Sequence, residues 1–485
     1  MAIRNSKTNT NALPKVLAGA GAGLAAGFLL AGRNPWYTQS DTSRAIRVET
    51  DPISEIPEEA DVVVIGGGIS GISTALYLNE FGLKTVVFEK GSVANEASSR
   101  NFGWVYSNAL AQELLPMAEQ AKEHWFGFAD RFGFDVTARR TGNFTLAPTE
   151  KELDQHREWL VMAQKAAPTI DAQVLNQAEL EEKVPGVGKM FAGALYQPSD
   201  GMAEPSHAVP LIAKGARQEG VKIFERTAVR GFEYSGKAIS KVVTEHGSIR
   251  TKKVVLAGGS WTSYFLNNLG INLPQQNIAS SLLRFSGAKA GPGAAMGGDI
   301  FWRDELPGTV SIGTLQHIIP VEINSFKVLP AFAGSLKELL KDPLNVPLRI
   351  SIGPDFINSL KRKRRWKNDE VTEFERVRML TSRHIPAGHK KVFKALEEVF
   401  PDTKNAKVIE RWGGSMDALP DSLPVLDQVD QVPGLYVNSG YAGEGFSVGP
   451  GGGHLMAEIV AGREPSIDPT PFRFSRFHDG SQLSI

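Results

Sequence analysis

The chain has 485 residues and a mass of 52.6 kDa, which corresponds to about three average domains. Hydrophobic residues make up 42% of it, and this excludes a wholly disordered protein. Its 53 basic and 53 acidic residues cancel, which argues against a nucleic-acid binder that works through a global positive field. Because there is no cysteine, disulfides, iron–sulfur clusters and thiol catalysis are excluded.

The first recognisable segment is the uncharged stretch VLAGAGAGLAAGFLLAG at residues 16–32. As a helix it would be about 26 Å long, close to the roughly 30 Å hydrocarbon core of a bilayer. Three interpretations stay open: a cleaved signal peptide, an uncleaved anchor and a buried soluble helix. We expect an anchor over residues 1–33, since nothing upstream can form a partner domain. Arg4, Lys7 and Lys15 precede the stretch and favour a cytoplasmic N-terminus.

A βαβ unit is predicted next. The apolar, β-branched run DVVVI (61–65) is typical of a buried strand, and KTVVF (84–88) predicts a second one. Between them, the turn GGGISG has the GxGxxG spacing of a dinucleotide site. Gly66 allows the tight turn, Gly68 lets the backbone approach a pyrophosphate, and Gly71 lets the helix pack closely on the strand.

Two further features of this unit favour a dinucleotide cofactor. The helix that begins near Ile69 and Ser70 offers free N–H groups and a partial positive charge to phosphates. Glu89 ends the second strand, where a carboxylate can bind ribose hydroxyls. Strand, helix, second strand and acidic end occur in the required order, so we predict a bound dinucleotide.

The stretch after the second strand separates FAD from NAD. Residues 97–104, ASSRNFGW, resemble a segment of FAD-dependent amine oxidoreductases of the D-amino acid oxidase superfamily. The resemblance continues at 254–261 (VVLAGGSW), 412–425 (with WGG, PD and PV) and 434–447 (GLYVNSGYAGEGFS), and a helix is predicted over about 451–461. Within the superfamily the chain resembles the bacterial membrane-associated L-amino acid deaminases, through its apolar N-terminal segment and the stretches VVTEHGSIRTKKVVLAGG, FWRDE, INSLKRKRRW and PFRFSRF.

The resemblance implies a mixed α/β fold in which a Rossmann-like FAD-binding domain is interleaved with a substrate domain built on an antiparallel sheet, preceded by an N-terminal membrane helix. We expect a linker at 34–55, which is polar and contains prolines. The remaining boundaries are predicted at 56–135, 200–270 and 405–475 for the FAD-binding domain, and at 136–199 and 271–404 for the substrate domain, with a membrane-associating insertion at about 320–380.

The resemblance also implies which residues hold FAD. They come from the segments quoted above, with Lys90 after the second strand and Val229 after the strand-like run KIFE: Gly66, Gly68, Ile69, Ser70, Gly71, Glu89, Lys90, Ser98, Ser99, Arg100, Gly103, Trp104, Val229, Ala257, Gly258, Gly443, Gly445, Phe446 and Ser447. The chain has no cysteine, and residues 91–110 contain no histidine, so we predict that FAD is bound noncovalently.

Three residues are predicted at the substrate. Arg303 matches the superfamily's carboxylate-binding arginine, although a salt bridge with Asp304 or Glu305 is the alternative. Glu444 stands where the nearest relatives have an aromatic residue, and Trp104 where they have glutamine. A carboxylate at this place can accept the ammonium proton, bind a cationic substrate group, or serve as a structural partner for a main-chain N–H.

Two groups of basic residues lie outside these motifs. Arg284 is on a strand-like run and either lines the substrate cavity or lies on a solvated strand face. Residues 361–367, KRKRRWK, are the strongest charge cluster, and a charge run of this kind is usually a solvated face. Basic residues beside Trp366 also suit an anionic membrane surface, so we expect membrane lipid as a partner, with the active site near the quinone pool.

The activity implied by the resemblance is the oxidative deamination of L-amino acids to 2-oxo acids and ammonia, with hydride passing from the substrate Cα to flavin N5 and electrons passing to a respiratory chain. A D-amino acid or N-methyl amino acid dehydrogenase stays open, since a fold does not fix substrate handedness. A non-catalytic flavin electron carrier is the alternative from another class. The predicted location is the bacterial inner membrane, with the catalytic domain on the periplasmic face.

Overall fold

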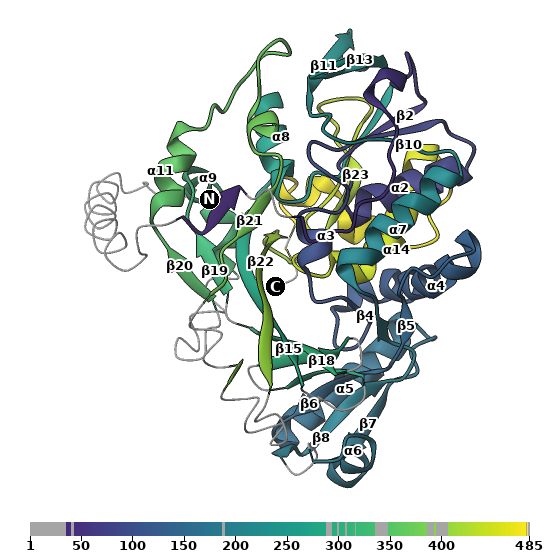
Figure 1. Cartoon of the computed structure of the whole chain (residues 1–485), viewed down its shortest axis with the longest axis vertical. Helices are drawn as coiled ribbons and strands as arrows, with labels where there is room; N and C mark the ends of the chain where they lie inside the picture. The colour runs from purple at the N-terminus through teal and green to yellow at the C-terminus, as the bar shows by residue number, and fades with distance from the viewer. Residues whose placement is uncertain are drawn as a thin grey trace, which may run out of the picture.

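A computed structural model describes residues 35–39, 43–186, 190–287, 293–297, 300–305, 308–315, 317–334, 348–385, 392–393, 406–481 and 483. Two large sheets organise this part of the chain, one in the upper right and one in the lower half of Figure 1. The predicted N-terminal membrane helix, residues 1–33, lies outside the described residues. Among the described helices, none is long and apolar enough to cross a bilayer.

The first sheet has six strands, and all neighbours except the last pair are parallel. In spatial order they are β10 (Lys222–Phe224), β3 (Thr85–Phe88), β2 (Val62–Ile65), β14 (Lys253–Leu256), β24 (Leu435–Ser439) and β23 (Val425–Gln428). The predicted strands at 61–65 and 84–88 are therefore confirmed as β2 and β3, side by side. Strands from three distant parts of the sequence meet here, as an interleaved FAD-binding domain requires.

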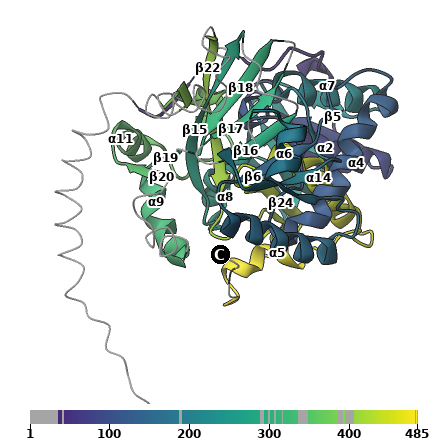
Figure 2. The same ribbon diagram turned by 90° about the horizontal axis from the view of Figure 1, so that it is seen from below.

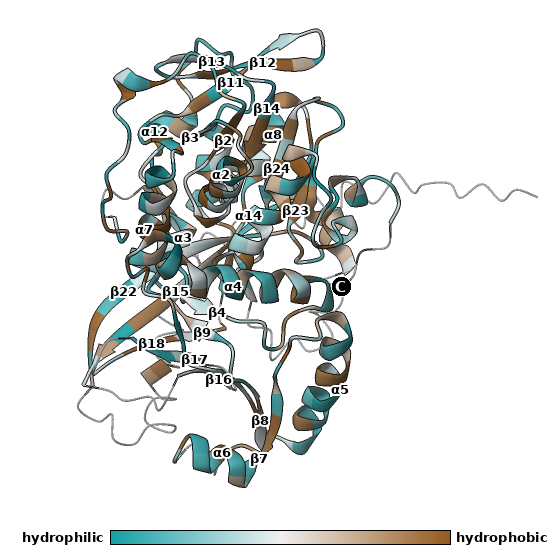
Figure 3. Ribbon diagram, turned by 90° about the vertical axis from the view of Figure 1, so that its right-hand side faces the viewer, coloured by the Kyte–Doolittle hydropathy of each residue, from teal (hydrophilic) through white to brown (hydrophobic). Residues whose placement is uncertain are grey.

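Alternating side chains of β2 supply both faces of this sheet, because successive residues of a strand point to opposite sides. Val62 and Val64 join one hydrophobic core, whereas Val63 joins another. The first core is covered by α2 (Ile69–Glu80), α4 (Leu115–Phe132), α7 (Pro205–Gln218) and α14 (Gly445–Ala461). The second is covered by β11 (Val229–Ser235), β12 (Ala238–Thr244), β13 (Gly247–Arg250) and α8 (Thr262–Leu269). Figure 3 shows the hydrophobic ribbon concentrated around β24 and α8.

Helix α14 begins at Gly445, earlier than the predicted start at about residue 451, and Pro450 lies inside it. A proline has no N–H, so the carbonyl of Phe446 loses its ordinary helical partner. The indole Nε1 of Trp125 donates to that carbonyl at 3.1 Å, which replaces the missing bond. The sequence predicted a later start for the helix because the donor that compensates for Pro450 comes from α4, far away in the chain.

The second sheet is mainly antiparallel, with parallel pairs only at β16–β6 and β19–β20 among the described strands. Its order is β20 (Leu348–Ser351), β19 (His317–Pro320), β15 (Gln276–Ser286), β18 (Thr309–Thr314), β17 (Ile300–Asp304), β16 (Ala294–Gly297), β6 (Asn143–Ala147), β8 (Gly193–Gln197) and β7 (Gln173–Asn176). Helices α5 (Glu150–Ala166) and α6 (Gln177–Lys183) pack beside β7 and β8.

Strand β22 (Lys407–Ala418) pairs antiparallel with β15 along nearly its whole length. The predicted boundary at residue 405 assigned this segment to the FAD-binding domain, whereas β22 pairs with a strand of the second sheet. The motif WGG lies on β22 and carries the chain back from the substrate sheet to the first sheet. The position of β22 depends on its pairing with β15, more than 100 residues earlier in the chain, and a single sequence does not reveal such long-range pairing.

The predicted linker, residues 34–55, is held against the body wherever it is described. β1 (Tyr37–Gln39) pairs with β21 (Leu380–Ser382), and the main-chain N–H of Trp36 donates to Asp355 at 2.7 Å. Further along, the N–H of Asp51 donates to the carbonyl of Ile223 at the edge of the first sheet. These hydrogen bonds to distant residues explain why a polar, proline-containing stretch does not behave as a free linker.

Short elements complete the fold. Three two-residue strands, β4 (Trp104–Val105), β9 (Gly201–Met202) and β5 (Arg139–Arg140), form a small sheet between the two large ones. Within the predicted insertion lie α9 (Ile323–Val328), the 3-10 helix η5 (Leu329–Phe332), α11 (Pro354–Lys361) and α12 (Glu373–Arg376). Helix α3 is Ala97–Arg100, and the other 3-10 helices are η1 (Ile53–Glu55), η2 (Gln112–Leu114), η4 (Gly259–Trp261), η7 (Thr470–Phe472) and η8 (Phe474–Phe477).

The aromatic residue of the basic run is part of the core. Trp366 is 8% exposed, stacks on Tyr264 with ring centroids 5.2 Å apart, and donates from Nε1 to the carbonyl of Arg230 at 2.7 Å. Within the run, Arg362 is paired with Glu322 at 2.9 Å. The indole of Trp366 therefore belongs to the core beneath α8, and membrane binding by the basic residues around it stays a prediction.

Three rings from three helices meet beside the first sheet: Tyr77 of α2, His124 of α4 and His454 of α14. Their centroids lie 4.7 Å (Tyr77–His124), 4.8 Å (Tyr77–His454) and 5.2 Å (His124–His454) apart. Burial lowers the pKa of His124 to about 4, and the neighbouring His454 acts in the same direction. The folded protein therefore keeps this imidazole neutral.

We expect the free energy of unfolding to decrease as the pH falls from about 6.5 towards about 4, since the unfolded state then binds a proton that folded His124 refuses. His124→Gln should flatten this dependence by up to about 1.4 kcal/mol per pH unit. Urea unfolding at several pH values measures the slope, with His207→Gln, at an exposed histidine, as the control. A slope in His124→Gln equal to that of the unmodified protein would contradict the expectation.

Candidate active site

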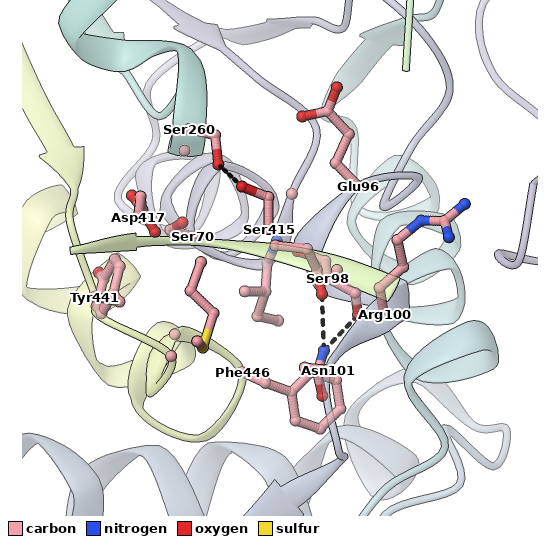
Figure 4. Close-up of a pocket in the computed structure, with 18 of the residues that line it drawn as sticks. Ser70, Glu96, Ser98, Arg100, Asn101, Ser260, Ser415, Asp417, Tyr441 and Phe446 are labelled. Atoms are coloured by element: carbon pink, nitrogen blue, oxygen red, sulfur yellow. Dashed lines mark hydrogen bonds between the residues drawn. The ribbon is translucent and has the colours of Figure 1, made fainter. Parts of the chain in front are cut away.

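A cavity of about 580 Å³ lies where the carboxyl ends of the parallel strands meet the second sheet. The residues that follow β2, β3 and β14, namely Gly66, Glu89 and Ala257, line one end of it. Ligands of open α/β sheets bind at this edge. In Figure 4 the labelled lining residues are spread along β22, from Tyr441 and Asp417 near one end to Ser98 and Arg100 near the other.

The glycine turn after β2 forms a cradle that side chains cannot occupy. Gly66 has φ +113°, and a Cβ there would come within 2.3 Å of the carbonyl oxygen of Ala257. A Cβ on Gly71 would come within 2.0 Å of the carbonyl oxygen of Gly66. Gly68 immediately precedes helix α2 and lines the cavity. The turn therefore presents bare backbone and a helix N-terminus to the cavity, which suits a pyrophosphate.

Glu89 fixes the shape of this turn. Its carboxylate accepts hydrogen bonds from the N–H groups of Gly67 at 2.8 Å and Gly91 at 2.7 Å. Burial raises the pKa of Glu89, and these N–H donors together with Lys90 oppose that rise. The residue thus lies at the predicted end of β3 and borders the cavity, where a ribose hydroxyl would meet a carboxylate.

The loop ASSRNFGW contributes a second wall through α3. The hydroxyl of Ser98 accepts from the N–H of Ile69 at 2.9 Å, which ties the loop to the first turn of α2. Arg100 lines the cavity and donates to the carbonyl of Gly413 at 3.3 Å. Burial lowers the pKa of Arg100 to about 10. Ser99 is fully buried and does not line the cavity, so its predicted contact with FAD is not supported by its position.

The other predicted cofactor residue outside the cavity lining is Gly71, which packs α2 against the turn as described above. The structure brings all the remaining predicted cofactor residues together around the one cavity: Gly66, Gly68, Ile69, Ser70, Glu89, Lys90, Ser98, Arg100, Gly103, Trp104, Val229, Ala257, Gly258, Gly443, Gly445, Phe446 and Ser447. They come from segments almost 400 residues apart, and their convergence supports one extended dinucleotide site.

One part of the cavity lining is aromatic and includes the carboxylate of Glu444. Trp104, Tyr106 and Phe301 form it, together with Met296. The hydroxyl of Tyr106 donates to Glu444 at 2.5 Å. Burial raises the pKa of Glu444, and the hydrogen bond from Tyr106 opposes that rise. Apolar walls around a few polar groups are the usual composition of a small-molecule pocket.

Arg303 does not line this cavity. It is 2% exposed, and its guanidinium lies 2.9 Å from Glu204 and 2.7 Å from Glu305. The alternative considered for Arg303, a salt bridge with Glu305, is what the structure shows, but the pair is buried rather than on the surface. The guanidinium lies directly behind the cavity wall, since a Cβ on Gly103 would come within 3.0 Å of its Cζ.

Arg284 likewise lies outside the cavity lining and pairs with Glu410 at 2.8 Å. It is on the same face of β15 as Ile278, Ser280 and Leu282, which do line the cavity, because alternate residues of a strand share a face. Arg284 therefore lies on the strand face that borders the cavity, as one of the two predictions required. The cavity extends along β15 only as far as Leu282, so Arg284 lies outside it.

Several lining residues could not be singled out from the sequence. Tyr106, Phe301 and Met296 border the substrate end, and so does His317 of β19. Burial lowers the pKa of His317 to about 4, so it is neutral in the folded protein. Three further lining residues, Ile278, Ser280 and Leu282, alternate along β15. Strand alternation predicts that they share a face, and it is the one sequence signal that points to lining residues of this kind. The others reach the cavity through strand pairing that no local pattern encodes.

Comparison with known proteins agrees with this geometry. A family model described as FAD dependent oxidoreductase matches residues 61–459. The chain belongs to this family. It is therefore an oxidoreductase, and its cofactor is FAD. The turn at Gly66 and Gly68 fits that cofactor, because it presents bare backbone and the N-terminus of α2 to the cavity.

Solved structures show the same relationship. The L-amino acid deaminase from Proteus myxofaciens, determined in complex with anthranilate, is similar to this oxidoreductase with a TM-score of 0.86 and 35% identity, and the match covers 92% of this chain and 99% of that one. The L-amino acid deaminase from Proteus vulgaris gives a TM-score of 0.83 and 32% identity over 88% and 99% of the two chains.

Sequence relatives lie farther away. The sarcosine oxidase subunit beta of Arthrobacter sp is 28% identical over 430 residues, which are 87% of this chain and 91% of that protein. The glycine oxidase of Pseudomonas aeruginosa is 26% identical over 433 residues, or 85% and 97% of the two chains. The resemblance to L-amino acid deaminases that the sequence motifs indicated is thus confirmed at the level of the family and of the fold.

The way FAD is held in this oxidoreductase stays a prediction that acid precipitation tests. We expect trichloroacetic acid to release all the flavin into the supernatant, since the chain has no cysteine and the loop beside α3 has no histidine. Flavin fluorescence that remains on the protein band in a denaturing gel would contradict this. His317, which borders the cavity, would then be the first residue to replace.

Proposed function

We propose that this protein catalyses the oxidative deamination of L-amino acids to 2-oxo acids and ammonia. The observation that carries the proposal is the single cavity in which the glycine cradle at Gly66 runs on into the aromatic pocket at Trp104 and Tyr106. An amino acid in that pocket would lie at the far end of a dinucleotide held in the cradle. The similarity to two Proteus L-amino acid deaminases at 32–35% identity supports amino acids as the substrate class.

FAD, when bound, supplies the acceptor for the hydride that leaves the substrate Cα. The chain's own contribution is to hold the substrate in one orientation and to exclude water. Trp104, Tyr106 and Phe301 provide the walls that do both. The first turn of α14, which begins at Gly445, directs main-chain N–H groups and a partial positive charge towards the same space, where they stabilise negative charge.

Arg303 acts in this scheme through Gly103 rather than on the substrate. Its guanidinium lies behind that glycine and donates to the carbonyl of Ala203 at 3.2 Å and to Glu204. The N–H of Ala203 in turn donates to the carbonyl of Gly103 at 2.9 Å. We therefore assign Arg303 to positioning the segment that carries Trp104.

Anaerobic bleaching of the flavin by an amino-acid panel tests the proposal. Bleaching by several L-amino acids, with the 2-oxo acid and ammonia as products, is the expected result. Bleaching by D-isomers or by N-methyl amino acids alone would replace the proposal with a dehydrogenase of that specificity, as the resemblance to sarcosine oxidase subunit beta keeps open. Bleaching by none of these compounds would leave a flavin electron carrier.

Membrane attachment is the second part of the proposal. Within the predicted insertion, four short elements carry five exposed large apolar side chains: Phe326 (47%), Leu329 (51%), Ile350 (60%), Ile357 (37%) and Leu360 (51%). They lie on α9, η5, β20 and α11, which form one side of the molecule next to β19 (Figure 2). We assign this apolar surface to a lipid bilayer, with electrons leaving to a membrane quinone and the domain on the periplasmic face of the bacterial inner membrane.

The start of the described chain supports this assignment, because Trp36 bonds to Asp355 and to Ser351 beside the same surface. A predicted anchor that ends at residue 33 would therefore emerge next to it. A protein that lacks residues 1–33 is expected to bind anionic vesicles, and replacing Leu329 and Leu360 by glutamate should abolish that binding while the flavin content is retained. Binding that is unaffected by the replacements would show that this surface is not the one involved.

A further inference from the structure

The carboxylate of Glu444 is held in place at one oxygen only. Oε2 accepts the hydroxyl of Tyr106 at 2.5 Å, whereas Oε1 has no hydrogen-bond partner among the described residues. The residue lies at the start of α14, and its own N–H donates to the carbonyl of Tyr441. The geometry is therefore that of a fixed carboxylate with one oxygen available to a ligand.

Glu444 differs in this respect from the other acidic residues that line the cavity. Glu89 accepts two main-chain N–H groups, Glu96 accepts Lys90 at 2.6 Å, and Asp417 accepts the N–H of Gly440 at 2.8 Å. Among the described lining residues, Glu444 is the acid that has neither a cation nor an N–H donor. A buried charge without an opposite partner is unfavourable, so a cationic group of the ligand would stabilise it.

The surrounding rings favour the same kind of ligand. The rings of Trp104 and Tyr106 have centroids 5.5 Å apart and those of Trp104 and Phe301 5.8 Å, all roughly edge to face. Aromatic faces attract ammonium and guanidinium groups, by about 0.5–2 kcal/mol each. The cationic lining residues bond to other groups: Lys90 to Glu96, Arg378 to Glu245 and Arg100 to the carbonyl of Gly413.

We propose that Glu444, fixed by Tyr106 and flanked by Trp104, makes this enzyme selective for L-amino acids that carry a cationic side chain, such as arginine and lysine. The inference rests on the proposed deamination of L-amino acids and names its substrate class. The distal guanidinium or ammonium group binds Oε1 of Glu444 and the neighbouring ring faces. The α-amino group, which is lost in the reaction, is then bound elsewhere in the pocket.

Matched substrate pairs isolate the charge from the size of the side chain. Citrulline has nearly the shape of arginine without its charge, and norleucine lacks the charge of lysine. We expect kcat/KM to be at least tenfold higher for arginine than for citrulline and for lysine than for norleucine. In Glu444→Gln, which keeps the shape of the side chain, both ratios should decrease at least tenfold. Equal ratios in the two proteins would overturn the inference.

Two further variants guard against indirect effects. Tyr106→Phe removes the hydroxyl that fixes Oε2 but keeps the ring, and it should lower both ratios by a smaller factor, about two- to fivefold. Glu123→Gln changes an exposed charge on α4, with 77% of its side chain exposed, and controls for the field of the whole protein; its ratios should be unchanged. Flavin content and thermal unfolding confirm that each variant is folded.

The outcomes separate this inference from the function on which it rests. If leucine and phenylalanine bleach the flavin while arginine gains nothing over citrulline, the deamination stands and the selectivity is refuted. If Glu444→Gln lowers kcat/KM by one factor for all four substrates, the carboxylate serves the α-amino group that they share, which also refutes the selectivity. If no L-amino acid bleaches the flavin, both proposals fail together.

Discussion

Gly66→Ala is expected to produce a protein that retains less than a tenth of its FAD. The Cβ would lie 2.3 Å from the carbonyl oxygen of Ala257, and φ at Gly66 is +113°, where L-residues are strained. Neither obstacle can relax cheaply, since both the turn and the end of β14 are main chain in the centre of the first sheet. Overpacking of this kind costs typically about 1–3 kcal/mol, and the displaced turn can no longer follow a pyrophosphate.

Flavin absorbance per mole of purified protein measures this effect, and thermal unfolding with and without added FAD shows whether the fold survives. Gly127→Ala is the matched control: Gly127 lies within α4, and no atom lies within 4 Å of the position that the new methyl group would take. That change should leave the flavin content unaltered and stabilise the helix by about 0.5–1 kcal/mol. Full flavin occupancy in Gly66→Ala would refute the assigned role of the turn.

Lys122→Met should lower the free energy of unfolding by about 3–5 kcal/mol, since it leaves a buried carboxylate without its cation. Lys122 is 2% exposed and its Nζ lies 3.1 Å from Asp200, which is fully buried. Burial raises the pKa of Asp200 to about 6 even with Lys122 present. Removal of the ammonium group therefore forces Asp200 to take up a proton or to remain charged in an apolar surrounding.

The same carboxylate accepts the main-chain N–H groups of Ser107 at 3.0 Å and Asn108 at 3.2 Å, directly after Tyr106. We therefore expect Lys122→Met to impair substrate binding as well as stability. The double variant Lys122→Met with Asp200→Asn removes both charges and should recover more than half of the loss. Chemical denaturation of the two single variants and the double variant gives the coupling energy; strictly additive losses would show that the pair does not act as a unit.

The part of the fold that the sequence predicted is the part encoded locally. The run DVVVI, the glycine turn and KTVVF form β2, the turn and β3 where expected, because strand propensity, turn chemistry and helix periodicity agree over fewer than 30 residues. The boundary at residue 405 and the start of α14 depended on partners elsewhere. β22 lies in the second sheet because it pairs with β15. The helix can include Pro450 because Trp125 donates to the carbonyl of Phe446, which the proline leaves without its helical partner.

The site divides in the same way. Small residues with a main-chain role, such as Gly66, Gly68 and Gly258, could be placed in the cavity from their motifs. Arg303 shows the limit: a motif places an arginine on a strand, but its partners decide whether the guanidinium faces a ligand or another carboxylate. Here Glu204, which is about 100 residues away in the sequence, pairs with Arg303. No sequence pattern around Arg303 predicts this pairing.

The wide separation in sequence of the cavity walls sets the order of events during biosynthesis. The cradle at Gly66 is translated first, and Gly445 and Ser447, which line the same cavity, follow almost 400 residues later. Pairing of β1 with β21 likewise joins residues more than 300 positions apart. Chains with such distant pairings fold slowly and expose apolar surface meanwhile. The site can therefore close around its cofactor only after the ribosome has translated Ser447, which makes flavin supply at that stage a determinant of the yield of active enzyme.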